Sequence, residues 1–532
     1  MLGRVRDPFE PQLRRARDLE IAGDLAAAHA IYESVLRAEP GRLYVRMRLS
    51  LLEQAFGHYR RSREHALAAA DAVRSGRWSQ IGSVTARLLA FDEGEALHGL
   101  IRAADWSSVE IARNSPLLAQ QLYLTDRADM ALDLIDAVFA KAADSEHLSY
   151  ARANALRYTG RLDEATAEYE RCLSLQPNYV HAHWALAYHQ ASDPPLSRIE
   201  RIEKTQAALD PASPDQAYLH YALFKEYDAA DDADSAWRHL MAGAQIKRRT
   251  LRYDSAAEQA DFEAVMRSVD ADFIHDPRST LPNPDRVPIF VVGMPRTGTT
   301  LLERILGNQS RAAAGGELRD FNTALCLATD GFVPSSPTPA WLERLRAIDL
   351  AGVGDEYLRR TADRYAGGRY LIDKNPMNFA YAGHVAKALP QAKILCLRRN
   401  AMDACFSNLK ELFTNAAYGY SYDQAELADH YARFSALCDH WQRAMPERFL
   451  TVDYEDLVSD PLSASDRIAG FCGLAFEPDS VDITRNRTAV ATASSSQVRQ
   501  PIHRRGVNAW RKYEAYLQPL QERLDRAASI GS

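Results

Sequence analysis

The stretch VPIFVVGMPRTGTTLLERIL, residues 287–306, narrows the choice of fold more than any other part of the chain. An apolar run, a turn and apolar residues at helical spacing predict a β-strand, a loop and an α-helix. Gly293 and Gly298 have the spacing of a nucleotide phosphate loop, G-x-x-x-x-G-K-S/T. Thr299 stands where the lysine belongs, and Arg296 puts a cation inside the loop instead. Because the backbone N–H groups of such a loop converge, the segment predicts an anion site.

After residue 286 the sequence alternates between apolar β-rich segments and helical stretches. The β-rich segments are Pro288–Val292, Tyr370–Ile372, Lys393–Leu397 and Phe449–Val452. Such alternation predicts a parallel sheet covered by helices. We therefore expect residues 286–527 to form an α/β three-layer domain of the P-loop-like kind, with the glycine loop after its first strand.

The first half of the chain repeats a spacing of small, aromatic and proline residues. Two copies share intervals of five, four and eight: Gly23, Ala28, Tyr32 and Pro40, then Gly160, Ala165, Tyr169 and Pro177. This spacing resembles the 34-residue tetratricopeptide repeat, a pair of helices. Weaker copies surround Ala131 and Ala236, so residues 1–250 predict an α-solenoid of about four to six helix pairs. An irregular helical bundle is the alternative, and residues 251–285 predict a linker helix with a proline-rich boundary.

Composition and charge exclude several classes of protein. The 532 residues suit two or three domains. A net charge of −7 gives no basic field, so we expect no binding to nucleic acid. The N-terminus lacks the apolar core of a signal peptide and no apolar run reaches the length of a membrane span. We therefore expect no integral membrane segment and a cytoplasmic location, with export by an unusual route left open.

The six cysteines form no C-x-x-C pair, which predicts buried free thiols.

The loop sequence PRTGTT resembles the 5′-phosphosulfate-binding loop of the sulfotransferase family. Members of this family transfer a sulfuryl group from 3′-phosphoadenosine 5′-phosphosulfate. The resemblance implies that this donor occupies the loop and that no metal is required. The loop residues that it assigns to the 5′-phosphosulfate are Arg296, Thr297, Gly298, Thr299 and Thr300.

A second segment of the same family follows the apolar run Lys393–Leu397. Arg399 and Ser407 match the arginine and serine that grip the 3′-phosphate of the donor in the family. An arginine fork with a hydroxyl group suits a phosphate dianion. Taken alone, Arg399 would be interpreted as a surface arginine.

Two further segments match catalytic groups of the family. Lys374, after Tyr370–Ile372, matches a lysine placed at the sulfuryl group, and a solvated lysine in a turn is the alternative. Cytosolic small-molecule members carry a histidine two residues later, where Pro376 stands here. This departure favours the branch that uses a carboxylate base, and Glu317 in GGELR matches that base in tyrosylprotein and several glycan sulfotransferases. The alternative for Glu317 is an acid that interacts with a helix dipole.

The segment SSSQVRQPIHRRG near the C-terminus resembles two branches of the family at once. Ser494 matches a serine that assists the transition state in tyrosylprotein sulfotransferase. Arg504, Arg505 and Gly506 resemble the segment that closes over the 3′-phosphate in cytosolic members, with the choice between the two arginines open. Tyr454 matches the tyrosine that lines the adenine pocket, and a core aromatic at a strand end is the alternative.

Repeats followed by such a domain resemble the bacterial tetratricopeptide-repeat sulfotransferases. The resemblance implies that Glu317 removes the acceptor proton while Lys374, Arg296 and Ser494 stabilise the leaving oxygen. A protein tyrosine, a glycan hydroxyl or a lipid hydroxyl would suit this base as acceptor. The solenoid would hold a peptide or protein in its groove, form a homodimer or brace the second domain. Two other hypotheses are a P-loop kinase or ATP-binding switch, with Asp373 as a magnesium ligand, and a scaffold with an inactive second domain.

Overall fold

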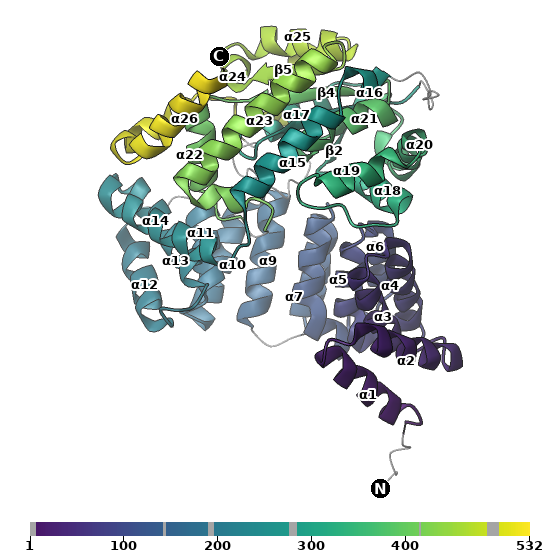
Figure 1. Cartoon of the computed structure of the whole chain (residues 1–532). Helices are drawn as coiled ribbons and strands as arrows, with labels where there is room; N and C mark the ends of the chain where they lie inside the picture. The colour runs from purple at the N-terminus through teal and green to yellow at the C-terminus, as the bar shows by residue number, and fades with distance from the viewer. Residues whose placement is uncertain are drawn as a thin grey trace. The chain divides into compact units, whose positions relative to one another are not determined.

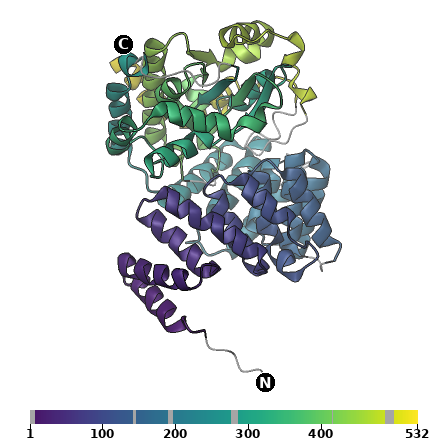
Figure 2. The same ribbon diagram turned by 90° about the vertical axis from the view of Figure 1, so that its right-hand side faces the viewer.

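The computed structural model describes residues 7–141, 145–189, 196–275, 285–413, 416–486 and 500–531. The chain divides into two compact units. The first contains residues 1–144 with 322–333, and the second contains residues 145–321 with 334–532 (Figure 1 and Figure 2). The second unit therefore combines part of the solenoid region with the α/β region.

The first unit is all-helical. Its full helices are α1 (Glu10–Ile21), α2 (Leu25–Ala38), α3 (Leu43–Ala55), α4 (Tyr59–Arg74), α5 (Ile81–Leu89), α6 (Gly94–Arg102), α7 (Val109–Leu124) and α8 (Ala128–Phe139). Gly23 joins α1 to α2 with a φ of +84°, a conformation that favours glycine. Ala28 and Tyr32 of α2 are fully buried in a core shared with α1 and α3. The small and aromatic residues of the repeat therefore have the roles that its spacing predicts.

Residues 322–333 also belong to the first unit, where they pack on α4. The Nε of Arg60 donates to Leu327 O at 2.7 Å, and the backbone N–H of Arg60 donates to Asp330 Oδ1 at 2.7 Å. The rings of Tyr59 and Phe332 lie 5.2 Å apart, edge to face. This segment includes most of α18 (Asp320–Thr329), which begins three residues after Glu317.

The second unit begins with six more helices of the solenoid. They are α9 (Glu146–Thr159), α10 (Leu162–Leu175), α11 (Val180–His189), α12 (Leu196–Ala208), α13 (Gln216–Ala229) and α14 (Ala233–Arg249). Gly160 ends α9 with a φ of +85°, and the hydroxyl of the buried Tyr169 donates to Asn154 Oδ1 at 2.9 Å. Two linker helices follow, α15 (Ser255–Ser268) and α16 (Ala271–His275). Most of the expected proline-rich boundary, residues 276–284, lies outside the described residues.

The described residues contain more helix pairs than the sequence predicts. Fourteen helices between Glu10 and Arg249 make seven pairs, instead of four to six. The predicted number of helix pairs is too small because α3, α4 and α5 pack through a buried polar network and lack the residues of the repeat signature. Ser50 Oγ donates to Ser62 O at 2.7 Å, and Arg87 Nε donates to Ser50 Oγ at 2.7 Å. Serine and arginine at these positions carry no repeat signal.

The second unit also holds a five-stranded parallel sheet, which confirms the predicted fold class. The strands are β1 (Val287–Gly293), β2 (Ala312–Gly316), β3 (Tyr370–Asp373), β4 (Lys393–Arg398) and β5 (Phe449–Asp453), in the spatial order β2-β3-β1-β4-β5. The sequence predicts four of the five. It misses β2, because its sequence AAAGG has none of the β-branched or aromatic residues that favour strands.

Helices cover both faces of this sheet (Figure 1). The remaining α-helices are α17 (Thr299–Gly307), α19 (Pro339–Arg346), α20 (Leu350–Arg360), α21 (Ala382–Ala388), α22 (Ala401–Leu409), α23 (Gln424–Ala444), α24 (Tyr454–Ser459), α25 (Pro461–Cys472) and α26 (Gln518–Gly531). Ile289 and Val291 share a buried cluster with apolar residues of α17 and α25. Phe290 points to the other face, where its ring lies 5.5 Å from that of Tyr357 on α20. The alternation along β1 therefore produces the three layers.

The cysteines and the helix lengths agree with the sequence analysis. All six cysteines are free and buried, as predicted. In the part of the chain that the structure describes, every helix is too short or too polar to cross a bilayer.

Candidate active site

The candidate site lies at the carboxyl edge of the parallel sheet. Each of the five strands ends next to one of its parts. These parts are the loop after Gly293, Glu317 after β2, Lys374 after β3, Arg399 after β4 and Tyr454 after β5. Because all strands are parallel, these groups lie on the edge where open α/β sheets bind their ligands.

The glycines of the loop are required by their conformations and by close contacts. Gly293 has a φ of +148°, and a Cβ there would lie 2.7 Å from Leu397 O. Gly298 has a φ of +103°, and a Cβ there would lie 2.6 Å from the ring of Tyr454. Gly298 also precedes the first residue of α17, so the free N–H groups of that helix face the loop. Backbone and helix N-terminus are therefore arranged as in loops that hold anions, and the anion site itself stays a prediction.

Gly298→Ala should lower the free energy of unfolding by about 2 kcal/mol, because it combines a left-handed backbone with a clash. Urea denaturation followed by circular dichroism measures this change. Gly470→Ala within α25 is the matched control, since a Cβ there meets nothing within 4 Å. Equal midpoints for the two variants would contradict this account of the loop.

Side chains from other elements hold the loop in place. Asn408 Nδ2 on α22 donates to Pro295 O at 2.8 Å. Arg296 lies in the left-handed region with a φ of +65°, and its Nε is 3.6 Å from Glu411 Oε2. Thr297 is fully buried, and its Oγ1 donates to Met294 O at 2.8 Å. The hydroxyl of Thr297 thus braces the loop, whereas Thr299 and Thr300 lie in the first turn of α17.

Arg399 connects the loop to three other segments of the site. Its Nη1 donates to Ser407 Oγ at 3.1 Å and to Arg296 O at 3.1 Å. Its Nη2 donates to Gly506 O, and its guanidinium lies 4.9 Å from the ring centre of Tyr454. The structure therefore brings together Arg399, Ser407, Tyr454 and Gly506, which span more than a hundred residues of the sequence. Arg399 and Ser407 are 7% and 6% exposed, so their cation and hydroxyl lie at the wall of the site.

Lys374 and Glu317 form a close ion pair. Lys374 Nζ lies 2.5 Å from Glu317 Oε1. The lysine side chain is 1% exposed and that of the glutamate 49% exposed, so the cation is buried and the carboxylate opens to solvent. The backbone N–H of Lys374 donates to Gly316 O at 2.9 Å, which fixes the two turns against each other.

Glu303 is a buried member of this group that the sequence analysis misses. It projects from α17, and its Oε1 accepts from the backbone N–H of Gly316 at 2.9 Å. Burial raises the pKa of Glu303, while the charge of Lys374 acts in the opposite direction. Glu303 thus ties the phosphate-loop helix to the turn that carries Glu317. Its sequence signal is weak, since a glutamate in LLERIL also suits a solvated helix face.

Comparisons with known proteins give matches to the same part of the chain. Residues 288–478 match the model of the sulfotransferase family. This part of the chain is a sulfotransferase-family domain. An uncharacterised protein of Aquifex aeolicus strain VF5 is 28% identical over 374 residues, 69% of this chain and 48% of that protein. Protein-tyrosine sulfotransferase 2 of Gallus gallus is 22% identical over 243 residues, 42% of this chain and 62% of that enzyme.

Solved sulfotransferase structures are among the matches to this chain. The sulfotransferase domain of the olefin synthase of Synechococcus PCC 7002 is 22% identical with a TM-score of 0.35. The match covers 48% of this chain and 98% of that chain. The matches to the two curated relatives extend over about half to three fifths of their length.

Asp373, the magnesium ligand in the kinase hypothesis, lies in the interior of the domain. It is fully buried, and Tyr357 OH donates to its Oδ2 at 3.1 Å. Burial raises the pKa of Asp373 well above its usual value. A carboxyl that is fully buried and hydrogen-bonded to a tyrosine is poorly placed to bind magnesium, which weakens the hypothesis of a kinase.

Asp373 should make the stability depend on pH. A carboxyl whose pKa is raised by folding binds more protons in the folded state, so the unfolding free energy falls as pH rises above about 4. Asp373→Asn should therefore reduce the fall in unfolding free energy between about pH 5 and pH 8. Urea denaturation at both values measures the difference, and a fall equal to that of the wild type would contradict this description of Asp373.

Among the described residues, Arg504 and Arg505 are not brought into these contacts. Ser494 lies outside the described residues. Arg504 and Arg505 are both exposed, and only the neighbouring Gly506 contacts Arg399. The choice between the two arginines therefore stays open.

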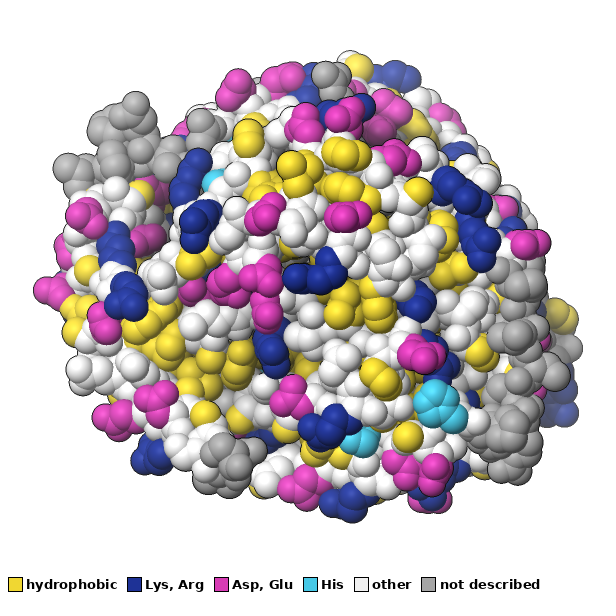
Figure 3. Space-filling view, turned by 90° about the horizontal axis from the view of Figure 1, so that it is seen from above, with side chains coloured by type: hydrophobic (Ala, Val, Ile, Leu, Met, Phe, Trp, Pro, Cys, Tyr) yellow, Lys and Arg dark blue, Asp and Glu magenta, His cyan; other side chains and the backbone are white. Residues whose placement is uncertain are grey.

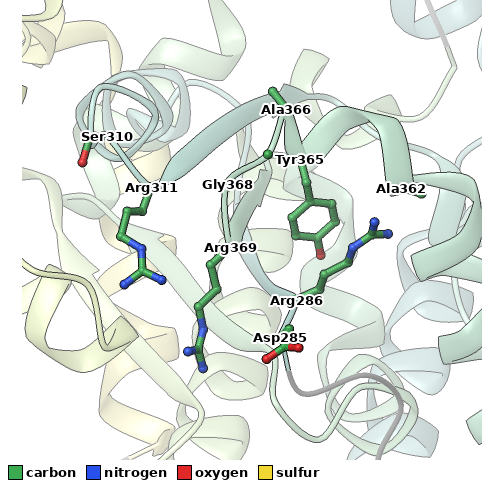
Figure 4. Close-up of a pocket in the computed structure, with 10 residues that line it drawn as sticks. Asp285, Arg286, Ser310, Arg311, Ala362, Tyr365, Ala366, Gly368 and Arg369 are labelled. Atoms are coloured by element: carbon green, nitrogen blue, oxygen red, sulfur yellow. The ribbon is translucent and has the colours of Figure 1, made fainter.

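A separate cavity lies at the opposite edge of the sheet (Figure 4). Its volume is about 660 Å³, and Arg286, Arg311 and Arg369 line it. These arginines directly precede β1, β2 and β3, so the cavity is at the amino edge and not in the candidate site.

On the face in Figure 3, basic side chains are interspersed with acidic ones, in agreement with the absence of a basic field.

Proposed function

We propose that this chain transfers a sulfuryl group from 3′-phosphoadenosine 5′-phosphosulfate to the hydroxyl group of an acceptor. The observation that best supports this is the meeting of three parts at one sheet edge. They are the glycine loop, the Arg399–Ser407 pair and the Lys374–Glu317 pair. An ATP site would need only the first of them.

The two anionic ends of the donor fit two different parts of the site. The loop from Arg296 to Thr300, with the N-terminus of α17, would hold the 5′-phosphosulfate. Arg399 and Ser407 would hold the 3′-phosphate, because a buried guanidinium and a hydroxyl offer several donors to a dianion. Tyr454 would border the adenine, and the segment at Gly506 with Arg504 or Arg505 would close over the 3′-phosphate.

The transfer is a single displacement at sulfur. The acceptor oxygen forms a bond to sulfur while the bond from sulfur to the 5′-phosphate oxygen breaks. The acceptor proton goes to Glu317, and the products are a sulfate ester and adenosine 3′,5′-bisphosphate. Lys374, Arg296 and Ser494 would stabilise the charge that grows on the leaving oxygen. Because Lys374 and Arg296 supply the positive charge that magnesium supplies in phosphoryl transfer, we propose a reaction without a metal.

The exposure of Glu317 supports its role as the base. Its carboxylate is half-exposed, so an acceptor hydroxyl can reach it, while the buried Lys374 holds one of its oxygens. A carboxylate fixed in this way is oriented for proton abstraction. A protein tyrosine, a glycan hydroxyl and a lipid hydroxyl all fit this chemistry.

A radiolabelled donor tests the proposal. The protein is incubated with donor that carries sulfur-35 and with an extract of cells that lack the gene, and labelled products are identified by mass spectrometry. We expect labelled acceptor together with adenosine 3′,5′-bisphosphate. If neither acceptor labelling nor donor turnover occurs while ATP binds tightly, the proposal is wrong and the kinase hypothesis is favoured.

A further inference from the structure

Two tyrosines of the solenoid bind the C-terminal end of α22, the helix that carries Ser407. Tyr221 OH on α13 donates to Leu409 O at 2.9 Å. Tyr188 OH on α11 donates to Lys410 O at 2.8 Å. The last carbonyls of a helix have no partner within the helix, so each tyrosine satisfies a group that would otherwise need water. Burial raises the pKa of both phenols well above 10, which keeps their hydroxyls protonated as donors.

The residues just before these carbonyls hold the proposed donor site. Ser407 accepts from Arg399 at 3.1 Å, and Asn408 donates to Pro295 O of the phosphate loop at 2.8 Å. Both lie within the last turn of α22, immediately before Leu409. A shift of this turn would therefore move a proposed 3′-phosphate ligand and a support of the 5′-phosphosulfate loop together.

A second contact from α13 reaches the segment that follows Gly506. Asp228 Oδ1 accepts from Tyr513 OH at 2.7 Å and lies 2.9 Å from Lys512 Nζ. The ring of Tyr513 lies 5.1 Å from that of Phe406 on α22. Helix α13 thus supports two of the segments that contact Arg399, which are α22 and the chain around Gly506.

The charges at this end of α22 also suit an anion. Burial lowers the pKa of Lys410 to about 8; the charges of Lys225, Arg296 and Arg399 act in the same direction, and that of Asp228 acts against them. Lys225 comes from α13 of the solenoid. A phosphorylated ligand would offset the mutual repulsion of these four cations, so the solenoid contributes charge to the site as well as contacts.

We propose that Tyr188 and Tyr221 are positioning residues of the donor site, through which solenoid helices α11 and α13 set the geometry of Ser407 and the phosphate loop. This inference rests on the proposed function, because it assigns the donor to that site. It makes the end of the solenoid a part of the donor-binding machinery, in addition to any binding of a partner in its groove.

Binding of adenosine 3′,5′-bisphosphate, the product of the proposed donor, tests this inference by calorimetry. The variants are Tyr188→Phe, Tyr221→Phe and the double variant, which remove hydroxyl groups and keep the rings. We expect the double variant to bind about tenfold more weakly, since buried carbonyls lose their partners. The KM for the donor should rise by a similar factor, while kcat and the KM for the acceptor stay within about twofold.

Tyr227→Phe is the matched control. Tyr227 also lies on α13, but its OH donates to the exposed Glu203 Oε1 at 2.7 Å, away from α22. The Tyr227→Phe variant should bind adenosine 3′,5′-bisphosphate with the affinity of the wild type. Loss of folded protein would lower the number of binding sites per chain, whereas weaker binding leaves it near one. The single variant Tyr188→Phe, which removes one hydroxyl group, gives a second check on folding.

The outcomes distinguish this inference from the proposed function. If the wild type binds the bisphosphate and the double variant binds it equally well, the positioning role is wrong and the proposed function stands. A rise in the acceptor KM alone would also overturn the positioning role. If the wild type does not bind the bisphosphate, both the proposed function and this inference are wrong.

Discussion

Lys374→Met should lower kcat about 10²- to 10³-fold, the usual cost of removing one charged donor from a leaving oxygen. Methionine keeps most of the length of the side chain without its charge, and it is apolar enough for a site where lysine is 1% exposed. Binding of adenosine 3′,5′-bisphosphate should stay within about threefold of the wild type, because the lysine acts on charge that grows during the transfer. Single-turnover assays with labelled donor measure the rate, and calorimetry measures the binding.

Lys393→Met is the matched control for this change. Lys393 begins β4 at the opposite edge of the sheet, where its Nζ donates to Glu447 O at 2.8 Å. The kcat of the Lys393→Met enzyme should stay within about twofold of that of the wild type. A Lys374→Met enzyme with wild-type kcat would remove Lys374 from the mechanism.

Glu317→Gln should lower kcat by about 10²- to 10⁴-fold, the range that general bases contribute. Glutamine is nearly the same size and can still accept a hydrogen bond from Lys374, but it cannot take the acceptor proton. The KM for the donor should change little, because Glu317 lies beside Lys374 and outside the contacts of Arg399. Initial rates at saturating donor, measured against acceptor concentration, give the loss.

Glu343→Gln on α19 provides the control, since Glu343 is an exposed acid paired with Arg346 at 3.9 Å. Its activity should equal that of the wild type. If Glu317→Gln keeps full activity, Glu317 is a helix N-terminal acid without a catalytic role, which is the alternative that its sequence position allows.

Most of the α/β fold could be predicted because its strands are short, apolar and separated by helical patterns. Burial on both faces of a parallel sheet requires apolar runs such as IFVV and KILCL, and such runs are visible in sequence. The edge strand β2 could not be predicted, since alanine and glycine carry no strand signal and its pairing with β3 is formed between distant segments. Ser50, Ser62 and Arg87 show the same limit in the solenoid, where a polar network replaces the repeat signature.

The candidate site could be predicted where a residue directly follows a strand. Gly293, Lys374 and Arg399 follow apolar runs, so the parallel sheet brings them to one edge. Glu303 and Asn408 could not be predicted in the same way. Their partners, Gly316 and Pro295, are fixed by the packing of α17 and α22 and not by spacing along the chain.

The direct test of the central claim is a comparison of nucleotide affinities. Calorimetry would measure adenosine 3′,5′-bisphosphate and ADP without magnesium, and ATP with it. Because Arg399 and Ser407 are assigned to the 3′-phosphate, we predict that the bisphosphate binds about a hundredfold more tightly than ADP and needs no magnesium. Tighter binding of ATP with magnesium than of the bisphosphate would contradict the assignment of the loop to a phosphosulfate donor.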